Sequence, residues 1–235
     1  MTLHRFYLKQ TQHAGDMIKI IDKNIINQLL NVFRFKIGSS FVVFFGDEME
    51  HVVEISSFSK KEIICKVQET RKGIVQKKEI TLAFSVLKKE NSELVLQKCT
   101  ELGIINFVPI ISERTIKTGW KKDRLEKILI EAAEQSGFAK VPTLEEEPFA
   151  LKRYIEHYIK TNENVSGLVV LDFDGMPMNN VKNLIKISSI LVGPEGGWSP
   201  AEVEMFKTKN IQSISLGEQV LRAETACMAV AASLL

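Results

Sequence analysis

Two segments near the C-terminus carry the residues best suited to chemistry. They are GPEGGWSPAE, from Gly193 to Glu202, and SLGEQVLRAETA, from Ser215 to Ala226. Each follows an apolar run typical of a buried strand, SSILV or IQSIS, and each leads into a helical pattern. Because loops at the carboxyl ends of strands collect ligands in open α/β sheets, we expect the two loops to line one pocket.

The first loop combines glycines with a helix start signal. The S-P-x-E pattern at 199–202 predicts that a helix begins there. Gly193, Gly196 and Gly197 permit positive φ angles and let backbone groups approach a ligand closely. A tight structural turn would use glycine as well, so this loop alone is compatible with both roles. Neither G-x-x-x-x-G-K-[ST] nor G-x-G-x-x-G occurs, so phosphate binding is not expected.

The second loop holds Arg222, the only Lys or Arg after Lys209. It precedes ACMAVAASLL, which is apolar nearly all round and is therefore expected to be a buried helix. An arginine at the mouth of a buried helix needs a partner or a function. Two interpretations stay open: a structural ion pair with Glu195 or Glu224, or contact with a substrate.

The composition is that of an ordinary globular protein, with 45% hydrophobic and 26% charged residues. The N-terminus lacks the apolar core of a signal peptide, and no apolar stretch is long enough to span a membrane, so we expect a soluble cytoplasmic protein. Cys65, Cys99 and Cys227 show no C-x-x-C spacing, which argues against a disulfide framework and a zinc site. We expect all three to be buried.

Charge is unevenly distributed along the chain. Residues 1–130 carry 22 Lys and Arg against 15 Asp and Glu, whereas residues 131–235 carry 9 against 14. Such asymmetry is compatible with a surface that binds a polyanion, and equally with solvated lysine-rich faces that have no partner.

A change in the pattern of predicted strands and helices near residue 72 indicates two domains. Residues 1–72 read as short strands with frequent turns, including a hairpin-like turn at GDEM, and predict a small β-barrel. In residues 73–235 strands alternate with helices, which predicts an α/β domain with a mostly parallel sheet. We expect strands at 80–87, 104–111, 167–172, 188–193 and 211–217, and helices at 88–103, 123–137, 148–160, 179–186 and 199–209.

Both glycine loops, preceded by LVVLD, resemble the cofactor-pocket segments of the SPOUT methyltransferases, and in particular the RsmE family of 16S rRNA uridine-1498 N3-methyltransferases. The similarity covers nearly the whole chain. HRFYL, VFRFKIG, QKCTELGI, PIISERT and EAAEQSG all stand in the order found in the family.

The resemblance implies a fold, a cofactor and partners. The family has an N-terminal PUA-like β-barrel that binds RNA and a C-terminal domain that contains a trefoil knot, and it acts as a homodimer with its active site near the interface. The implied partner is 16S rRNA or the small ribosomal subunit, and no metal is implied. The residues expected to bind S-adenosylmethionine are Leu171, Gly193, Glu195, Gly196, Gly197, Leu216, Gly217, Val220, Leu221 and Thr225.

Methylation of uracil N3 requires loss of the N3 proton and stabilisation of negative charge on the carbonyl oxygens. Arg222 is the expected catalytic residue, because a guanidinium can orient the base or stabilise that charge. Glu195 and Glu224 are candidates for supporting roles, and solvent could equally accept the proton. The residues expected to contact RNA, mostly at phosphates, are His4, Arg5, Arg34, Lys36, Arg114, Lys117, Lys121, Lys122 and Arg124.

The sequence departs from the family at several positions. The family often has histidine at Gln28, leucine at Phe33, arginine at Phe138 and alanine at Cys99. An arginine at Phe138 would be an RNA or interface contact, and here that contact would fall to another residue such as Lys140.

Three alternatives have different consequences. A related SPOUT enzyme could methylate a ribose 2′-hydroxyl or another base, although the barrel and the QKCTELG and EAAEQSG segments argue against it. An inactive member would bind RNA without the cofactor. A conventional Rossmann methyltransferase could use LDFDG, at 171–175, as its acidic turn, but no glycine-rich first turn precedes it.

Overall fold

The computed structural model describes residues 3–9, 12–76, 78–116, 119–181 and 186–234. The chain forms two compact units. Unit 1 comprises Met1–Val75 together with Ala133–Val141, and unit 2 comprises Gln76–Ala132 and Pro142–Leu235. The boundary expected near residue 72 lies close to the end of the first stretch of unit 1. No sequence pattern indicated the contribution of 133–141.

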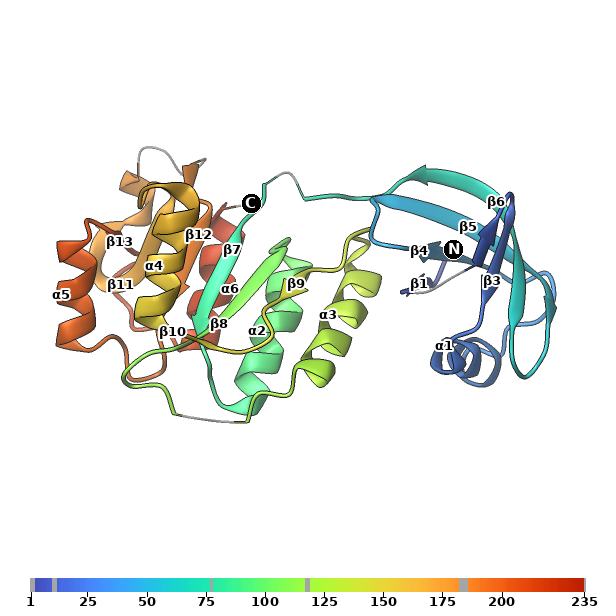
Figure 1. Ribbon diagram of the computed structural model, residues 1–235, viewed down its shortest axis with the longest axis horizontal. Coiled ribbons are helices and arrows are strands. Elements are labelled where there is room, and N and C mark those ends of the chain that lie inside the picture. Colours follow the sequence, from blue (N-terminus) through green and yellow to red (C-terminus); the bar gives the residue numbers. More distant parts are fainter. Residues whose placement is uncertain (1–2, 10–11, 77, 117–118, 182–185, 235) are drawn as a thin grey trace. The chain divides into compact units, whose positions relative to one another are not determined.

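Unit 1 is built on a curled six-stranded sheet with the form of a half-barrel, in the order β1-β4-β5-β6-β3-β2 (Figure 1). Strand β1 pairs with β4 in parallel, and the other pairs are antiparallel. The GDEM turn joins β4 to β5 as expected, with Gly46 and Glu48 at φ angles of 87° and 68°. The bounds are β1 Arg5–Tyr7, β2 Gln12–Ala14, β3 Met17–Ile20, β4 Ser40–Phe44, β5 Met49–Phe58 and β6 Ile63–Lys72.

A helical segment that the sequence analysis missed interrupts the strands of unit 1. Helix α1, Lys23–Asn27, begins at Asp22, whose carboxylate accepts the backbone N–H groups of Asn24 and Ile25 at 2.7 and 3.2 Å. It runs directly into a π-helix, Gln28–Val32. The cap and the buried Ile26 and Leu29 explain why the segment packs as a helix on the core of the unit.

Unit 2 is an α/β domain whose sheet has the order β10-β8-β7-β12-β11-β13, with β9 paired to β8. All of these pairs are parallel, which confirms the expected fold class. The expected trefoil knot stays a prediction. The bounds are β7 Thr81–Ser85, α2 Lys89–Glu101, β8 Asn106–Ile111, α3 Lys122–Ser136, β9 Thr143–Leu144, β10 Phe149–Ala150, α4 Leu151–Asn162, β11 Leu168–Pro177, β12 Ser189–Val192, α5 Pro200–Thr208, β13 Gln212–Ser215 and α6 Ala223–Leu234.

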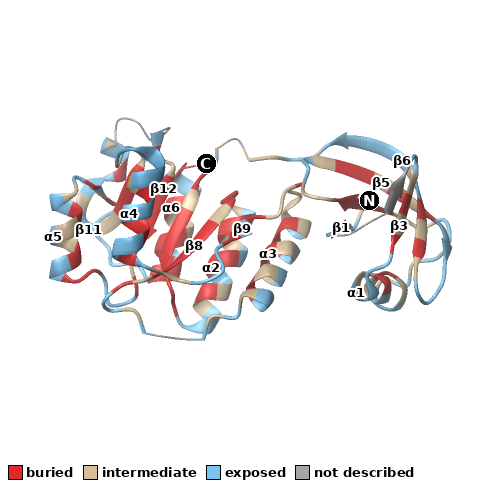
Figure 2. Cartoon of the chain, viewed as in Figure 1, coloured by how far each residue is buried: buried red, intermediate tan, exposed pale blue. Residues whose placement is uncertain are grey.

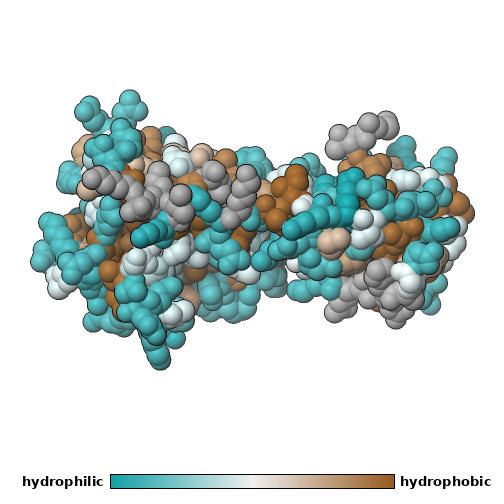
Figure 3. Space-filling view, turned by 90° about the horizontal axis from the view of Figure 1, so that it is seen from above, coloured by the Kyte–Doolittle hydropathy of each residue, from teal (hydrophilic) through white to brown (hydrophobic). Residues whose placement is uncertain are grey.

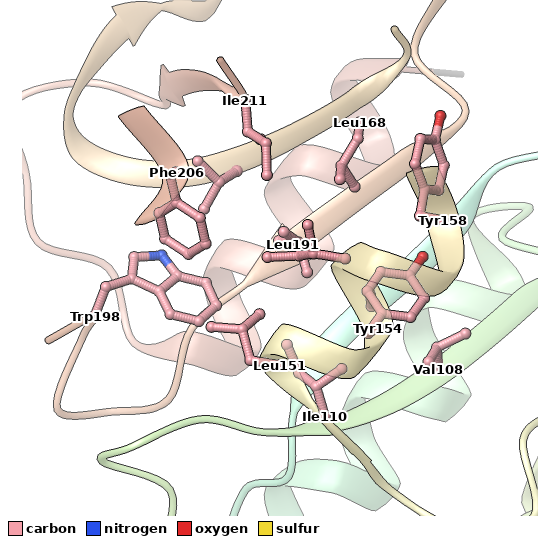
Figure 4. Packing of buried hydrophobic residues seen from close by; sticks show 13 residues of the cluster. Val108, Ile110, Leu151, Tyr154, Tyr158, Leu168, Leu191, Trp198, Phe206 and Ile211 are labelled. Carbon is pink, nitrogen blue, oxygen red and sulfur yellow. The ribbon is translucent and has the colours of Figure 1, made fainter. Parts of the chain in front are cut away.

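Helices cover both faces of this sheet (Figure 1). On one face, Tyr154 of α4 and Phe206 of α5 pack over Leu191 of β12, and Trp198 closes the cluster (Figure 4). On the other, α6 packs against α2 and β12. Buried residues therefore line the strands and the inner sides of the helices, while the outer sides are exposed (Figure 2).

Two expected helices differ in the structure, and one alternative is excluded. Residues 149–150 form strand β10, so α4 begins at Leu151 rather than at Pro148. Instead of a helix over 179–186, the described residues form a 3-10 turn at Met178–Asn180 and extended backbone at Val181, and residues 182–185 lie outside the described part. The LDFDG segment lies inside β11, at a register shift against β13, and so cannot act as the turn of a Rossmann fold.

Candidate active site

The two glycine loops meet at one cavity of about 340 Å³ in unit 2. The first loop follows β12 and the second follows β13, and β11 lies between these two strands in the sheet. The expectation that both loops line one pocket at the carboxyl ends of parallel strands is therefore confirmed.

The first loop is held rigidly by its own helix start. Ser199 Oγ accepts the N–H of Glu202, and the Glu202 carboxylate accepts the N–H of Ser199, as the S-P-x-E pattern predicts. The same buried carboxylate accepts the N–H of Glu113, at 2.8 Å, from the segment after β8. Glu202 thus fastens two segments that are distant in sequence to each other.

Two glycines of this loop allow close approaches. A Cβ on Gly193 would lie 3.0 Å from the Trp198 ring, so a larger residue would push the ring aside. The Trp198 indole N–H donates to the carbonyl of Leu171 at 2.9 Å, and the ring packs on the core while also lining the cavity. At Gly196 the carbonyl accepts a hydrogen bond of 2.8 Å from the Arg114 guanidinium.

The second loop places Arg222 at the rim. Its side chain is exposed, and both of its neighbours in the chain, Leu221 and Ala223, line the cavity. Within the described part of the chain neither Glu195 nor Glu224 pairs with it, so the structural ion pair considered from the sequence is wrong. Glu224 is buried instead, and accepts a long hydrogen bond of 3.4 Å from Asn91.

The structure gathers nine of the ten residues expected to bind the cofactor; Thr225 is exposed and does not line the cavity. The nine are Leu171, Gly193, Glu195, Gly196, Gly197, Leu216, Gly217, Val220 and Leu221. The sequence analysis missed further lining residues, which are Asp172, Phe173, Val192, Pro194, Trp198, Ser215, Gln219, Ala223 and Ala226. Most of them lie inside or beside the two loop motifs. The alternation along the strands and the small residues next to the loops were the sequence features that could have indicated them.

The charge of the lining indicates what it can hold. Asp172 and Glu195 contribute carboxylates, and the residues that line the described cavity include no Lys or Arg. Glycine backbone and the apolar side chains of Leu216, Val220 and Leu221 make up much of the remainder. Such a cavity favours a neutral or cationic ligand with apolar parts over a phosphate.

The basic residues expected to contact RNA divide between the two units. In unit 1, His4, Arg34 and Lys36 are exposed, whereas Arg5 is held by Glu50 and donates to the carbonyl of Phe138 at 3.2 Å. Phe138, at a position where the family often has an arginine, therefore contributes its backbone carbonyl to fixing Arg5 in this chain.

In unit 2, several of these cations have carboxylate partners. Arg124 binds Glu93 through two hydrogen bonds, of 2.6 and 2.9 Å, which lower the pKa of that carboxyl. Lys122 pairs with Glu146, whose hydrogen bond raises the lysine pKa. Lys121 is exposed. Lys117 lies outside the described residues.

Among the described residues, neither a metal-binding cluster nor a membrane-spanning helix is present. These residues contain no group of three or more His, Cys, Asp or Glu side chains placed to hold a metal ion. No helix among them is long and apolar enough to cross a membrane. Hydrophobic side chains on the surface are interspersed with hydrophilic ones (Figure 3).

Comparison with known proteins gives consistent results. Residues 75–235 match the model of the RNA methyltransferase domain family. The ribosomal RNA small subunit methyltransferase E of Rickettsia conorii is 29% identical over 97% of this chain and 93% of its own length, and that of Aquifex aeolicus is 31% identical over 79% and 80%. The crystal structure of the corresponding Neisseria gonorrhoeae enzyme bound to S-adenosyl methionine superposes with a TM-score of 0.86, at 28% identity, over 99% of this chain and 96% of that one.

Proposed function

We infer that this chain, which belongs to the RNA methyltransferase family and within it to the ribosomal RNA small subunit methyltransferases E, transfers a methyl group from S-adenosylmethionine to 16S rRNA. The observation that carries the proposal is the cavity between the two glycine loops, with its apolar and carboxylate lining. Its lining suits this cofactor.

The chemistry of the lining matches the parts of S-adenosylmethionine. The apolar side chains and glycine backbone can enclose an adenine, and Asp172 and Glu195 favour the positively charged sulfonium and ammonium groups. The bound cofactor supplies an electrophilic methyl group. The other requirements of the reaction fall to side chains of the protein, to the RNA and to solvent.

At the finer level, we propose N3 of uridine 1498 as the methylated atom. Attack by N3 needs an in-line approach to the methyl group, and positioning of this kind contributes up to about 7–11 kcal/mol in favourable cases. Arg222 is exposed beside the cavity, without a carboxylate partner among the described residues, and is therefore available to hold the uracil oxygens. Its charge would stabilise negative charge as the N3 proton leaves.

The proton acceptor has two protein candidates in different environments. Glu195 is exposed and lines the cavity, whereas Glu224 is buried, lies outside the lining and contacts Asn91. Geometry favours Glu195 as a direct acceptor and Glu224 as a residue that positions the start of α6. Solvent at the exposed rim is the third acceptor.

The proposal extends to assembly and location. A homodimer is supported by the apolar rim, because Val220 is 87% exposed and a second subunit would cover it. Measurement of the molar mass in solution by light scattering tests this point. The proposed substrate of this protein, the small ribosomal subunit, implies a cytoplasmic location.

Nucleoside analysis tests the activity. Small-subunit RNA that lacks the modification, or the subunit itself, is incubated with the protein and labelled S-adenosylmethionine, and labelled 3-methyluridine is the expected product. Large-subunit RNA and a reaction without protein are the controls. A ribose-methylated product would indicate the related SPOUT activity, and cofactor binding without any labelled nucleoside would sink the proposed function.

A further inference from the structure

Unit 1 carries a surface on which aromatic and basic side chains alternate. We call it the aromatic patch and define it by His4, Phe33, Arg34, Phe35 and Lys36. His4, Arg34 and Lys36 are exposed, and the two phenylalanines are half-buried. The patch lies at the junction of the π-helix and the segment that leads to β4. Nothing in the proposed chemistry of the cavity uses its rings.

The three rings of the patch contact one another at the surface. The His4 and Phe33 ring centroids lie 4.3 Å apart with the planes tilted by 47°, and those of His4 and Phe35 lie 5.9 Å apart. Phe33 and Phe35 are 5.6 Å apart. Together the rings form a continuous aromatic surface, part of which is open to solvent.

Buried rings support this surface from below. Phe6 packs edge-on against Phe33 at 5.6 Å, and Phe41 stacks with Phe35 at 5.7 Å. Phe6 and Phe41 are 1% and 0% exposed. Because the outer rings rest on a packed core, they are preorganised and lose little freedom when a flat ligand binds.

The backbone at the patch leaves a π-helix through a left-handed turn. The π-helix Gln28–Val32 immediately precedes Phe33, and π-helical turns occur often at functional sites. Arg34 then adopts a left-handed conformation with φ of 56°, which non-glycine residues seldom adopt without a structural or functional reason. Arg34 directly follows the C-cap Phe33, where helices often end in this conformation, and the Phe35 N–H donates to the carbonyl of Leu29 at 2.9 Å to close the turn.

In the described part of the chain, the two cations of the patch have no ion-pair partner. Neither Arg34 nor Lys36 makes an ion pair through its side chain among the described residues, in contrast to Arg5, which is held by Glu50. Val32 and Ile37 flank the patch and are 65% and 66% exposed. Aromatic faces with adjacent unpaired cations are the combination that binds single-stranded nucleic acid, in which bases stack and phosphates pair with Arg and Lys.

We propose that the aromatic patch binds an unpaired nucleotide of the RNA, with its base stacked on Phe33 and His4 and its flanking phosphates contacting Arg34 and Lys36. The proposal rests on the proposed function in so far as RNA is the substrate. The family that the sequence resembles often has leucine at the position of Phe33. That leucine also supplies a test variant, Phe33→Leu, that keeps an apolar side chain at the site.

A binding experiment can separate base stacking from phosphate contact. The affinity of the full chain is measured by fluorescence anisotropy for a short oligouridine and for an abasic oligomer of the same length and charge. The parent is expected to bind oligouridine about tenfold more tightly than the abasic oligomer, in line with the usual worth of a stacked base. Phe33→Leu removes most of this preference and leaves abasic binding unchanged.

Controls make the outcome specific. Phe58→Leu changes an exposed phenylalanine of the same unit outside the patch and should leave the preference intact. The double change Arg34→Ala with Lys36→Ala should weaken binding of both oligomers and flatten the salt dependence. If Phe33→Leu lowers the thermal stability of the protein, His4→Ala tests the same exposed ring surface, because His4 lies on the outside of the cluster.

The possible results decide between the proposals. Equal binding of oligouridine and the abasic oligomer, or a preference that survives both Phe33→Leu and His4→Ala, overturns the stacking proposal, as does failure to bind either oligomer. Methyl transfer is assayed separately with the parent protein. A base preference without methyl transfer would support the patch and overturn the proposed function. Methyl transfer without a base preference would support the proposed function and overturn the patch.

Discussion

At the scale of single residues, Arg222 is the side chain on which the proposed chemistry depends most. We expect Arg222→Ala to lower kcat by about 10²–10³-fold, the usual loss when one donor to a developing oxyanion is removed. Cofactor affinity should hold, since the Arg222 side chain lies outside the cavity lining. Arg222→Lys should recover only part of the rate, because an ammonium lacks the planar fork of donors. Single-turnover kinetics measure the rate, and calorimetry measures cofactor binding. Lys207→Ala, on the outside of α5, is the control. A rate for Arg222→Ala equal to that of the parent would show that the proposed role is wrong.

Asp172 is the second residue whose role can be isolated. Its carboxylate lines the cavity, and the sulfonium of S-adenosylmethionine carries a charge that S-adenosylhomocysteine lacks. We expect Asp172→Asn to weaken binding of S-adenosylmethionine by about tenfold, and binding of S-adenosylhomocysteine clearly less. Asp174→Asn, an exposed position on the same strand and outside the lining, is the matched control. Equal losses for both ligands in calorimetry would mean that the carboxylate contacts a part that the two ligands share.

At the scale of elements, Glu202 links the start of α5 to the segment that follows β8. Glu202→Ala leaves the N–H groups of Ser199 and Glu113 without their acceptor, so we expect the free energy of unfolding to fall by about 2–4 kcal/mol. Glu204→Ala, which alters an exposed glutamate of the same helix, should change it by less than about 0.5 kcal/mol. Urea unfolding measures both. Similar small losses for the two variants would contradict the fastening role of Glu202.

The elements also show how far the sequence can be interpreted. The S-P-x-E start of α5 and the stops of two helices at Gly103 and Gly137 were predictable, because each depends on residues within one turn of the helix end. The α1 and π-helix segment was not, although Asp22 offered a cap, because burial of Leu29 under the curled sheet decides it. The local pattern predicted a strand that ends at residue 172, whereas pairing with β13 extends β11 through Pro177. In each failure a long-range contact outweighed a local preference.

At the scale of the whole molecule, the same limit applies to the domains and to the site. Two strand-loop-helix patterns at the end of the chain were enough to predict a shared pocket, since the topology of parallel sheets brings such loops together. The association of 133–141 with unit 1 depends on contacts such as the Arg5 hydrogen bond to the carbonyl of Phe138, between residues far apart in the chain. No periodicity encodes such a contact. The ion pairs that engage Lys122 and Arg124 escaped sequence analysis for the same reason.

The buried cysteines should make the stability of the molecule fall as the pH becomes alkaline. Burial raises the pKa of Cys99 to about 12 from its ordinary value of 9.0. Above about pH 9 the unfolded chain therefore releases a proton that the folded chain retains, so stability present below that pH is lost as pH rises toward 12, by at most about 1.4 kcal/mol per pH unit for each thiol. Cys99→Ala, the residue usual in the family, should lose less stability than the parent in urea unfolding from about pH 8 to about pH 10. Parallel curves of unfolding free energy against pH for the two proteins would contradict the prediction. Titration of the lysines affects both proteins equally and therefore cancels in the comparison.

The same thiols can report whether the two units unfold separately. Cys65 lies in the core of unit 1, and Cys99 and Cys227 lie in unit 2; all three are buried. A thiol reagent should therefore label none of them rapidly in the native protein. In increasing urea, pulse labelling followed by peptide mass spectrometry should give one midpoint for Cys65 and a different, shared midpoint for Cys99 and Cys227, because the latter pair sits on α2 and α6, which pack together. Cys65→Ala checks that modification of one unit does not perturb the other. A single midpoint for all three would show that the two units unfold as one cooperative structure. Separate midpoints for Cys99 and Cys227 would show that the α2–α6 contact does not hold unit 2 together.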